Sequence, residues 1–353
     1  MPRSLRLMHR LTSGRRIRHP TCDSHGMTLA SADSQTALGA ITRADGLLLR
    51  CDAAALGLEQ DLRREFTKGH VFRLRYGVYV STSLWSGLGP NARYLCRIRA
   101  YAAVCPEPPV FSHHSAAAIW GLPRPAAWPT DVHITAPEAS GGRSRHGIVR
   151  HTAGPPPLAV SRDGLLVAPV TDTAVEMARL LPFPDAVAMM DRAIHIPRRG
   201  GSLATRGELE RSLETLAGPA RVKGRGAALR AAEFASTQSG SGGESISRAH
   251  IFLLGFAAPE LQVRFDDARG FIAFVDFFWR TINKVGEFDG LGKYLKEEYR
   301  RGLTTAQVVI AEKDREDRVR ALGPTFARWD WDIVRDLIAF GRFLGSHGIP
   351  RAR

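Results

Sequence analysis

The sequence has 353 residues, a hydrophobic content of 44% and a net charge of +14, with a pI near 10.3. This length predicts two or three domains, and the apolar content excludes an intrinsically disordered chain. The excess of positive charge indicates an anionic partner, and it favours nucleic acid.

The cysteines and the apolar runs indicate the compartment. Four cysteines occur without C-x-x-C spacing or paired histidines, so we expect free thiols and no zinc site. Such usage is typical of a reducing cytoplasm. No apolar run approaches the length of a membrane span, so the sequence predicts no membrane partner. The cysteines are Cys22, Cys51, Cys96 and Cys105.

Residues 1–33 carry six arginines against two aspartates, which gives a net charge of +4. They lack the continuous apolar stretch of a secretory signal. We expect a disordered basic extension. Two alternatives are an arm that contacts phosphates and translation that begins at Met27.

Residues 34–82 predict two helices followed by a hairpin. Thr42, with Asp45 three residues later, is a signal for the start of the first helix. The second helix has leucines and a phenylalanine on one face and ends at Gly69. A ribbon then alternates apolar and polar residues and turns near Tyr76 and Gly77. This order predicts a winged helix, whose second helix can enter the major groove of DNA.

Basic residues on this helix and ribbon are the candidate contacts to double-stranded DNA. The alternative is a solvated face on a small protein-interaction domain. Positive charge on both elements favours DNA. The residues are Arg63, Arg64, Lys68, Arg73 and Arg75.

Residues 83–200 predict a mixed α+β domain. His113 and His114 lie at a helix start, and no nucleophile or ligand partner accompanies them at a recognisable spacing, so we expect a capping or structural role. Residues 201–243 predict a helical connector, with Thr205 and Glu208 in capping-box spacing. Its end, "STQSGSGG", predicts a flexible linker and a domain boundary.

Residues 244–346 predict the element order α-β-β-β-α-β, followed by a tail over 347–353. Glu287 and Asp289 are two residues apart on a strand, so both point to one face. A short hairpin can bring Asp276 within about 5 Å of them. Converging carboxylates suit a hard divalent cation, so we expect Mg²⁺ or Mn²⁺.

Two further residues complete this candidate site. Glu244 on the first helix of the domain is positioned to supply a fourth carboxylate through water. Lys293, four residues after Asp289, is positioned to orient a water or to stabilise charge on a phosphorane. The alternative is that the acidic residues pair with basic side chains on the neighbouring helices, namely Arg248, Lys313, Arg315 and Arg318.

This element order, with "VDF" and "GEFDGLGK", resembles the PD-(D/E)XK nuclease superfamily, particularly its branch related to very-short-patch repair endonucleases. That branch commonly reads E-x-D-G-x-x-H, and Lys293 stands here at the position of the His. Asp289 occupies the position of the superfamily's Lys. The resemblance implies a restriction-endonuclease-like fold over roughly the last hundred residues.

The first two hundred residues are similar to the AbiEi-type antitoxins of abortive-infection systems. "GVYV", "SHHSAAAIWGLP" and "VTDTAVEMARLL" carry this likeness. It implies a winged helix joined to a second domain that serves regulation or neutralises a cognate toxin.

Two hypotheses follow. In the first, the chain is a metal-dependent DNA endonuclease in phage defence or repair: Asp276 and Glu287 hold the metal, Asp289 binds it or acts as a base, Lys293 assists, and Glu244 is in the outer shell. In the second, the protein is a non-catalytic, antitoxin-like transcriptional regulator whose nuclease fold has decayed. The missing Lys at position 289 and the antitoxin-like first half favour the second. Three carboxylates and Lys293 would be costly to keep in a decayed pocket, so the first hypothesis leads slightly.

Overall fold

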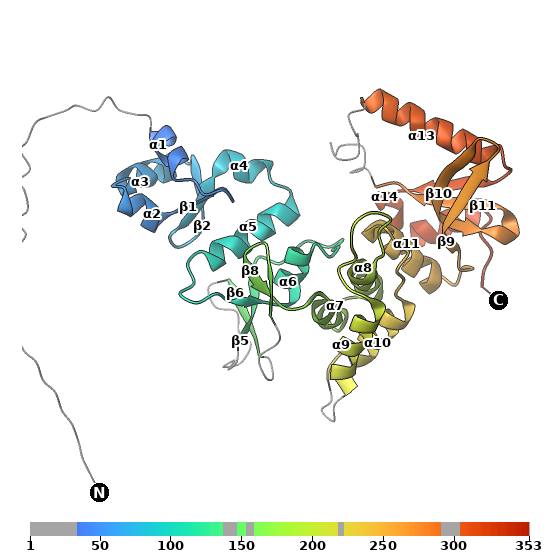
Figure 1. The fold of residues 1–353 in the computed structure, drawn as a ribbon, viewed down its shortest axis with the longest axis horizontal. Helices are drawn as coiled ribbons and strands as arrows, with labels where there is room; N and C mark the ends of the chain where they lie inside the picture. Colours follow the sequence, from blue (N-terminus) through green and yellow to red (C-terminus); the bar gives the residue numbers. More distant parts are fainter. Residues whose placement is uncertain (1–33, 137–146, 153–158, 218–221, 291–303, 353) are drawn as a thin grey trace, which may run out of the picture.

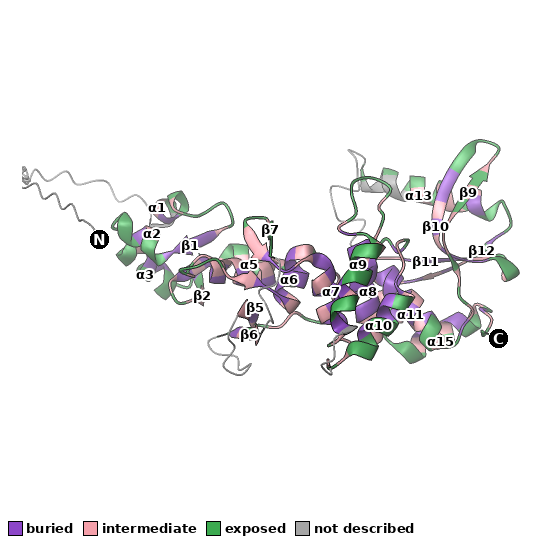
Figure 2. Cartoon of the chain, turned by 60° about the horizontal axis from the view of Figure 1, so that its bottom comes forward, coloured by how far each residue is buried: buried purple, intermediate pink, exposed green. Residues whose placement is uncertain are grey.

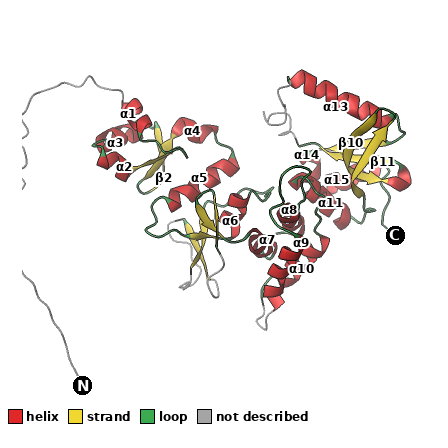
Figure 3. Ribbon diagram, viewed as in Figure 1, coloured by secondary structure: helices red, strands yellow, loops and turns green. Residues whose placement is uncertain are grey.

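The computed structural model describes residues 34–136, 147–152, 159–217, 222–290 and 304–352. They form a mixed α/β structure with three sheets, and helices lie between the second and third sheets (Figures 1 and 3). Residues 1–33, Met27 and Lys293 lie outside the described residues. No helix in the part of the chain that the structure describes is long and apolar enough to cross a membrane.

Residues 34–81, the amino-terminal unit, form a three-stranded antiparallel sheet of order β1-β3-β2 with three helices. The helix α3 is mostly exposed (Figure 2). It ends before Gly69, whose φ is +77°, as the sequence predicted. The elements are α1 (Ser34–Ala40), β1 (Leu47–Leu49), α2 (Arg50–Ala55), α3 (Glu59–Thr67), β2 (Val71–Arg75) and β3 (Val78–Ser81).

The prediction that Thr42 and Asp45 begin a helix is wrong. The Thr42 hydroxyl donates to the carbonyl oxygen of Leu38, and the Asp45 carboxylate accepts from the backbone N–H of Leu47. Both side chains therefore stabilise a turn that leads into β1. Pairing of β1 with β3 buries its three leucines, and this burial prevails over the local helix signal.

The second sheet has the strand order β6-β5-β4-β8-β7 and mixes parallel and antiparallel pairs. The helix α5 packs against both β2 and β5, so it connects the first two sheets. The elements are α4 (Thr82–Gly87), α5 (Pro90–Ala102), β4 (Val110–Phe111), α6 (His113–Trp120), β5 (Val132–Ala136), β6 (Ile148–Thr152), β7 (Val160–Arg162) and β8 (Leu165–Val167).

Helices from residue 170 to residue 253 pack around an apolar core rich in alanine and methionine. The capping box of Thr205 and Glu208 is present, as the sequence predicted. The elements are α7 (Val170–Ala178), α8 (Phe183–Ile194), α9 (Arg206–Glu214), the short turn η1 (Thr215–Ala217), α10 (Arg225–Phe234) and α11 (Gly242–Leu253).

The segment 236–243 is not the flexible linker that its composition predicts. The backbone N–H of Ser236 donates to Asp191, and the Ser241 hydroxyl caps α11. A Cβ atom at Gly243 would lie 2.0 Å from the ring of Phe288, so glycine permits close packing there. Since α11 also packs on α8, one core continues across the boundary expected at residue 243.

The third sheet has the order β12-β11-β10-β9, and only its β11–β12 pair is parallel. The helix α13 covers one face, while α11, α14 and α15 pack on the other. The predicted order α-β-β-β-α-β is present. The elements are β9 (Glu260–Asp267), β10 (Gly270–Trp279), η2 (Arg280–Ile282), β11 (Lys284–Phe288), α13 (Thr305–Arg320), β12 (Thr325–Trp329), α14 (Trp331–Val334) and α15 (Leu337–Ser346).

The expected tail beyond residue 346 is attached to the body of the protein. Arg351 forms a β-bridge with Phe256, and the backbone N–H of Ala257 donates to the carbonyl oxygen of Pro350. The guanidinium of Arg351 also lies 3.9 Å from the centroid of the Phe256 ring.

Asp191→Ala tests the contact between α8 and α11. Both oxygens of this fully buried carboxylate lie 2.9 Å from Nη2 of Arg248, so its removal leaves a buried guanidinium without its counter-charge. We expect a loss of about 3–5 kcal/mol in the free energy of unfolding, measured by urea denaturation. The matched control is Asp266→Ala, which breaks the exposed pair with Arg264 and should change the midpoint little. Equal effects of the two substitutions would contradict this account.

Candidate functional site

Asp276 on β10 and Glu287 on β11 face each other across the third sheet. The register pairs Phe277 with Gly286, so Asp276 and Glu287 are the next opposed residues. Both point to the face that α13 covers, because Phe278 and Val285 on the same face pack against Val319 of α13. The hairpin therefore brings these two carboxylates together, as the sequence predicted.

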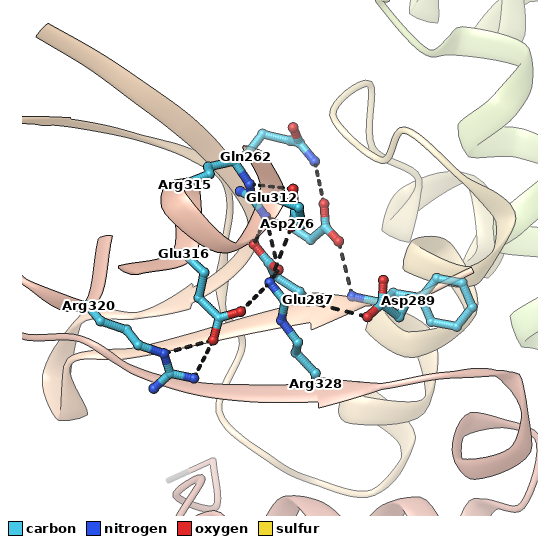
Figure 4. Close-up of polar contacts among 10 residues, drawn as sticks. Gln262, Asp276, Glu287, Asp289, Glu312, Arg315, Glu316, Arg320 and Arg328 are labelled. Carbon is cyan, nitrogen blue, oxygen red and sulfur yellow. Dashed lines mark hydrogen bonds and ion pairs between the residues drawn. The ribbon is translucent and has the colours of Figure 1, made fainter. Parts of the chain in front are cut away.

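Two arginines bind the Glu287 carboxylate, which is only 8% exposed. Nη2 of Arg315 on α13 lies 3.0 and 3.2 Å from its two oxygens, and Nη2 of Arg328 on β12 lies 2.7 Å from one of them. Figure 4 shows the two guanidinium groups reaching Glu287 from different elements. Burial raises the pKa of Glu287, the two arginines oppose this shift, and Asp276 adds to it.

Two N–H groups donate to Asp276. One carboxylate oxygen accepts from the backbone N–H of Phe288 at 3.1 Å, and the other lies 3.4 Å from the side-chain nitrogen of Gln262 on β9. The same nitrogen lies 3.3 Å from the buried carboxylate of Glu244, which also accepts from the backbone N–H of Gly240. The Gln262 amide thus lies between two carboxylates of the candidate site.

The backbone of Gln262 is strained at this position between the two carboxylates. Its φ is +50° within β9, a value that residues other than glycine rarely adopt in a strand. The oxygen of its side-chain amide accepts from Arg198, whose guanidinium lies 3.6 Å from the centroid of the Phe274 ring. Sequence reasoning missed Gln262, because no local pattern indicates a positive φ at this position.

Asp289 does not join the carboxylates of Asp276 and Glu287. Its side chain is 40% exposed, and its carboxylate lies 3.7 Å from Arg328. The residue follows the last residue of β11, and its backbone N–H donates to the carbonyl oxygen of Trp329. Lys293, the fourth predicted catalytic residue, is outside the described residues.

Sequence reasoning also missed most of the charged network above the sheet. Arg328 lies 3.3 Å from Glu312 and 2.9 Å from Glu316, and Arg315 bonds to Glu312 as well. The spacing of residues 312, 315 and 316 places these side chains on one face of α13, which is a readable signal. Among the basic partners expected for the carboxylates, Arg315 binds Glu287, whereas Arg248 pairs with Asp191 and Arg318 with Asp267.

This arrangement does not fit a divalent cation. Mg²⁺ requires several oxygen ligands around one point, whereas the oxygens of Glu287 accept from two guanidinium groups and those of Asp276 from two N–H donors. Among the described residues, no three His, Cys, Asp or Glu side chains are placed to hold a metal ion.

The five candidate DNA contacts occupy the amino-terminal unit. Arg63, Arg64 and Lys68 are exposed on or just beyond α3, and Arg64 and Lys68 pair with acidic residues of the same helix. Arg73 on β2 is exposed, and its guanidinium lies 5.6 Å from the centroid of the Phe66 ring. Arg75 instead packs on α5, where its guanidinium lies 4.6 Å from the centroid of the Tyr101 ring.

Four histidines from α6, β5 and β6 lie together, and we call them the histidine cluster. His113 and His114 meet His133 of β5 and His151 of β6. The sequence predicted a capping or structural role for the first two, and it missed their contacts with histidines of strands that are distant in sequence. Histidines in both "DVHIT" and "IVRHT" were the available signal.

The chain was compared with known proteins. No family model matches it, and no curated protein matches it.

Arg315→Ala tests the electrostatics of Glu287. With Arg328 still present, we expect a loss of roughly 1–3 kcal/mol in the free energy of unfolding at pH 8. The loss should be smaller at pH 5, because a carboxyl group whose pKa is raised stabilises the folded state when protonated and loses that contribution as the pH rises.

Urea denaturation at the two pH values measures this difference. The matched control is Arg320→Ala, which removes a more exposed arginine of α13 that pairs with Glu316. Adding Glu287→Gln to Arg315→Ala should restore most of the lost stability. A loss that is independent of pH and is not rescued would show that Arg315 acts through packing alone.

Proposed function

We propose that this chain is a cytoplasmic DNA-binding regulator in which a winged helix precedes a restriction-endonuclease-like domain that is not catalytic. The observation that supports a regulator over a nuclease is the pairing of Glu287 with Arg315 and Arg328. In this arrangement protein cations supply the positive charge that a metal ion supplies in a nuclease.

The amino-terminal unit supports the DNA-binding part of this proposal. Its order of helices and strands is that of a winged helix, with α3 as the helix that enters the major groove. Arg63 and Arg64 are exposed on α3, and Arg73 is exposed on the adjacent hairpin. At the tip of that hairpin Tyr76 is 79% exposed, and its hydroxyl accepts from Arg50.

The AbiEi-like motifs extend the proposal to a partner. Residues 112–123 and 170–181, which carry the likeness, form α6, α7 and their flanks between the amino-terminal unit and the third sheet. We propose that this middle part of the chain binds a cognate toxin while α3 binds DNA.

Arg63→Glu tests DNA binding. Reversal of one charge at a phosphate contact should weaken binding to a mixed-sequence duplex by about tenfold or more and reduce the salt dependence of binding. Fluorescence anisotropy over a series of salt concentrations measures both quantities. Arg342→Glu on α15 is the control and should bind as the unmodified chain does. Equal affinities for the two variants would refute binding through α3.

A metal-dependent nuclease is the second candidate, because Asp276 and Glu287 are opposed and the Gln262 amide connects Asp276 to Glu244. Incubation of supercoiled plasmid with Mg²⁺ or Mn²⁺ tests it. The regulator proposal predicts no nicking above that of the Glu287→Gln variant. Nicking by the unmodified chain that this substitution abolishes would establish the nuclease.

A further inference from the structure

The histidine cluster brings four imidazole rings from three elements into contact. The rings of His113 and His151 are stacked, with centroids 3.5 Å apart and planes at 8°. Nδ1 of His133 lies 2.9 Å from Nε2 of His151, and the ring of His114 meets that of His133 edge to face at 4.8 Å. Through these contacts α6 is joined to β5 and β6.

We propose that the histidine cluster is an acid-sensitive lock, which holds α6 and α7 against the second sheet when its rings are neutral and releases them when the rings take up protons. The inference is independent of the proposed DNA-binding function.

The geometry requires an unprotonated nitrogen on two of the rings. The hydrogen bond between His133 and His151 needs one nitrogen that carries a proton and one that does not. Nδ1 of His114 accepts from Arg124 at 2.9 Å, because a guanidinium group can only donate. A proton on either accepting nitrogen would remove a hydrogen bond, and at His114 it would also place an imidazolium against the Arg124 guanidinium.

Burial also makes the four rings harder to protonate. Burial and the neighbouring histidines lower the pKa of His113 to about 2, of His114 to about 3 and of His133 to about 4. Burial also lowers the pKa of His151. At neutral pH the cluster is therefore uncharged.

One carboxyl group contacts the cluster directly. Oε2 of Glu176 on α7 lies 3.3 Å from both the backbone nitrogen and Nδ1 of His113. Burial raises the pKa of Glu176 to about 7, so this group loses its charge as the solution becomes acidic and does not then balance an imidazolium. The other charged groups that act on the cluster or on its neighbours are Arg124, Asp131, Asp172, Arg179 and Asp185.

The backbone also favours release. His113 has a φ of +49° at the first position of α6, a conformation that costs a non-glycine residue free energy. The contacts of the closed cluster hold it in this conformation. When protonation breaks those contacts, the strain is relieved as well.

The sign of the pH dependence follows from these shifts. Each histidine has a lowered pKa, so the stability that it contributes is present above pH 6.5 and is lost as the pH falls towards the folded-state values. Glu176 acts in the opposite direction, because its raised pKa favours the closed state in acid. Four histidines outweigh one carboxyl group, so acid opens the lock.

Release of α6 and α7 would loosen the contact between the second sheet and the helices that follow it. The helix α7 packs on both α6 and α8, and α8 contributes Asp191 to the buried pair with Arg248. The cluster thus lies between the amino-terminal unit and the helices that support the third sheet (Figure 1).

Hydrogen exchange of the full chain, read by mass spectrometry from pH 7 to pH 5, tests the proposal. After correction for intrinsic exchange rates, protection in α6 and α7 should fall at least about tenfold for each pH unit. A tenfold change per unit is what net uptake of one proton on opening produces. Protection in α15 should change less. Unchanged protection of α6 down to pH 5 would overturn the proposal.

The double variant His133→Gln, His151→Gln removes two protonatable rings and keeps polar side chains. We expect its loss of protection to move to lower pH by about half a unit or more. His347→Gln at the end of α15 is the matched control and should behave as the unmodified chain does. If the double variant does not fold, His114→Gln, which leaves the stacked pair intact, takes its place with a smaller shift in the same direction. A response identical to the control would refute the role of the cluster.

Discussion

A buried carboxylate requires positive charge or hydrogen-bond donors, and the third sheet is organised around this requirement at Glu287. The side chain is almost fully buried under α13, and Arg315 and Arg328 supply the compensating charge. Arg328 is on β12, which pairs in parallel with β11, so the same contact connects the last strand to the centre of the sheet. Glu312 and Glu316 then balance the second positive charge.

The carboxylates around Glu287 are paired with arginines from α13 and β12. Four acidic side chains, Glu287, Asp289, Glu312 and Glu316, share Arg315 and Arg328, and Arg320 adds a third positive charge through its pair with Glu316. Asp276 faces Glu287, and its carboxylate accepts from the side chain of Gln262 and from the backbone N–H of Phe288.

Short-range features of this site were predictable from sequence, and long-range ones were not. The hairpin that opposes Asp276 to Glu287 follows from two apolar runs with a short turn between them. Arg328 lies forty-one positions after Glu287, and parallel pairing of β12 brings it there, which no local pattern specifies. The positive φ of Gln262 and the meeting of His113 with His151 depend in the same way on tertiary contacts.

Two of the wrong predictions have one cause. Thr42 and Asp45 carry a helix-start signal, and residues 236–243 have the composition of a linker, but packing decides both conformations. The glycine at position 243 reflects contact with Phe288 and not freedom of the backbone. Local propensity was reliable where it agreed with burial, as at the Thr205 capping box.

Calorimetric titration with Mg²⁺ and Mn²⁺ tests whether Arg315 and Arg328 take the place of a metal ion at Glu287. We expect no uptake at millimolar cation by the unmodified chain, because the two arginines already bind the Glu287 carboxylate. Uptake that appears only when both arginines are replaced by glutamine would show that they stand in for a cation. Uptake by the unmodified chain that Glu287→Gln abolishes would contradict the account and favour the nuclease.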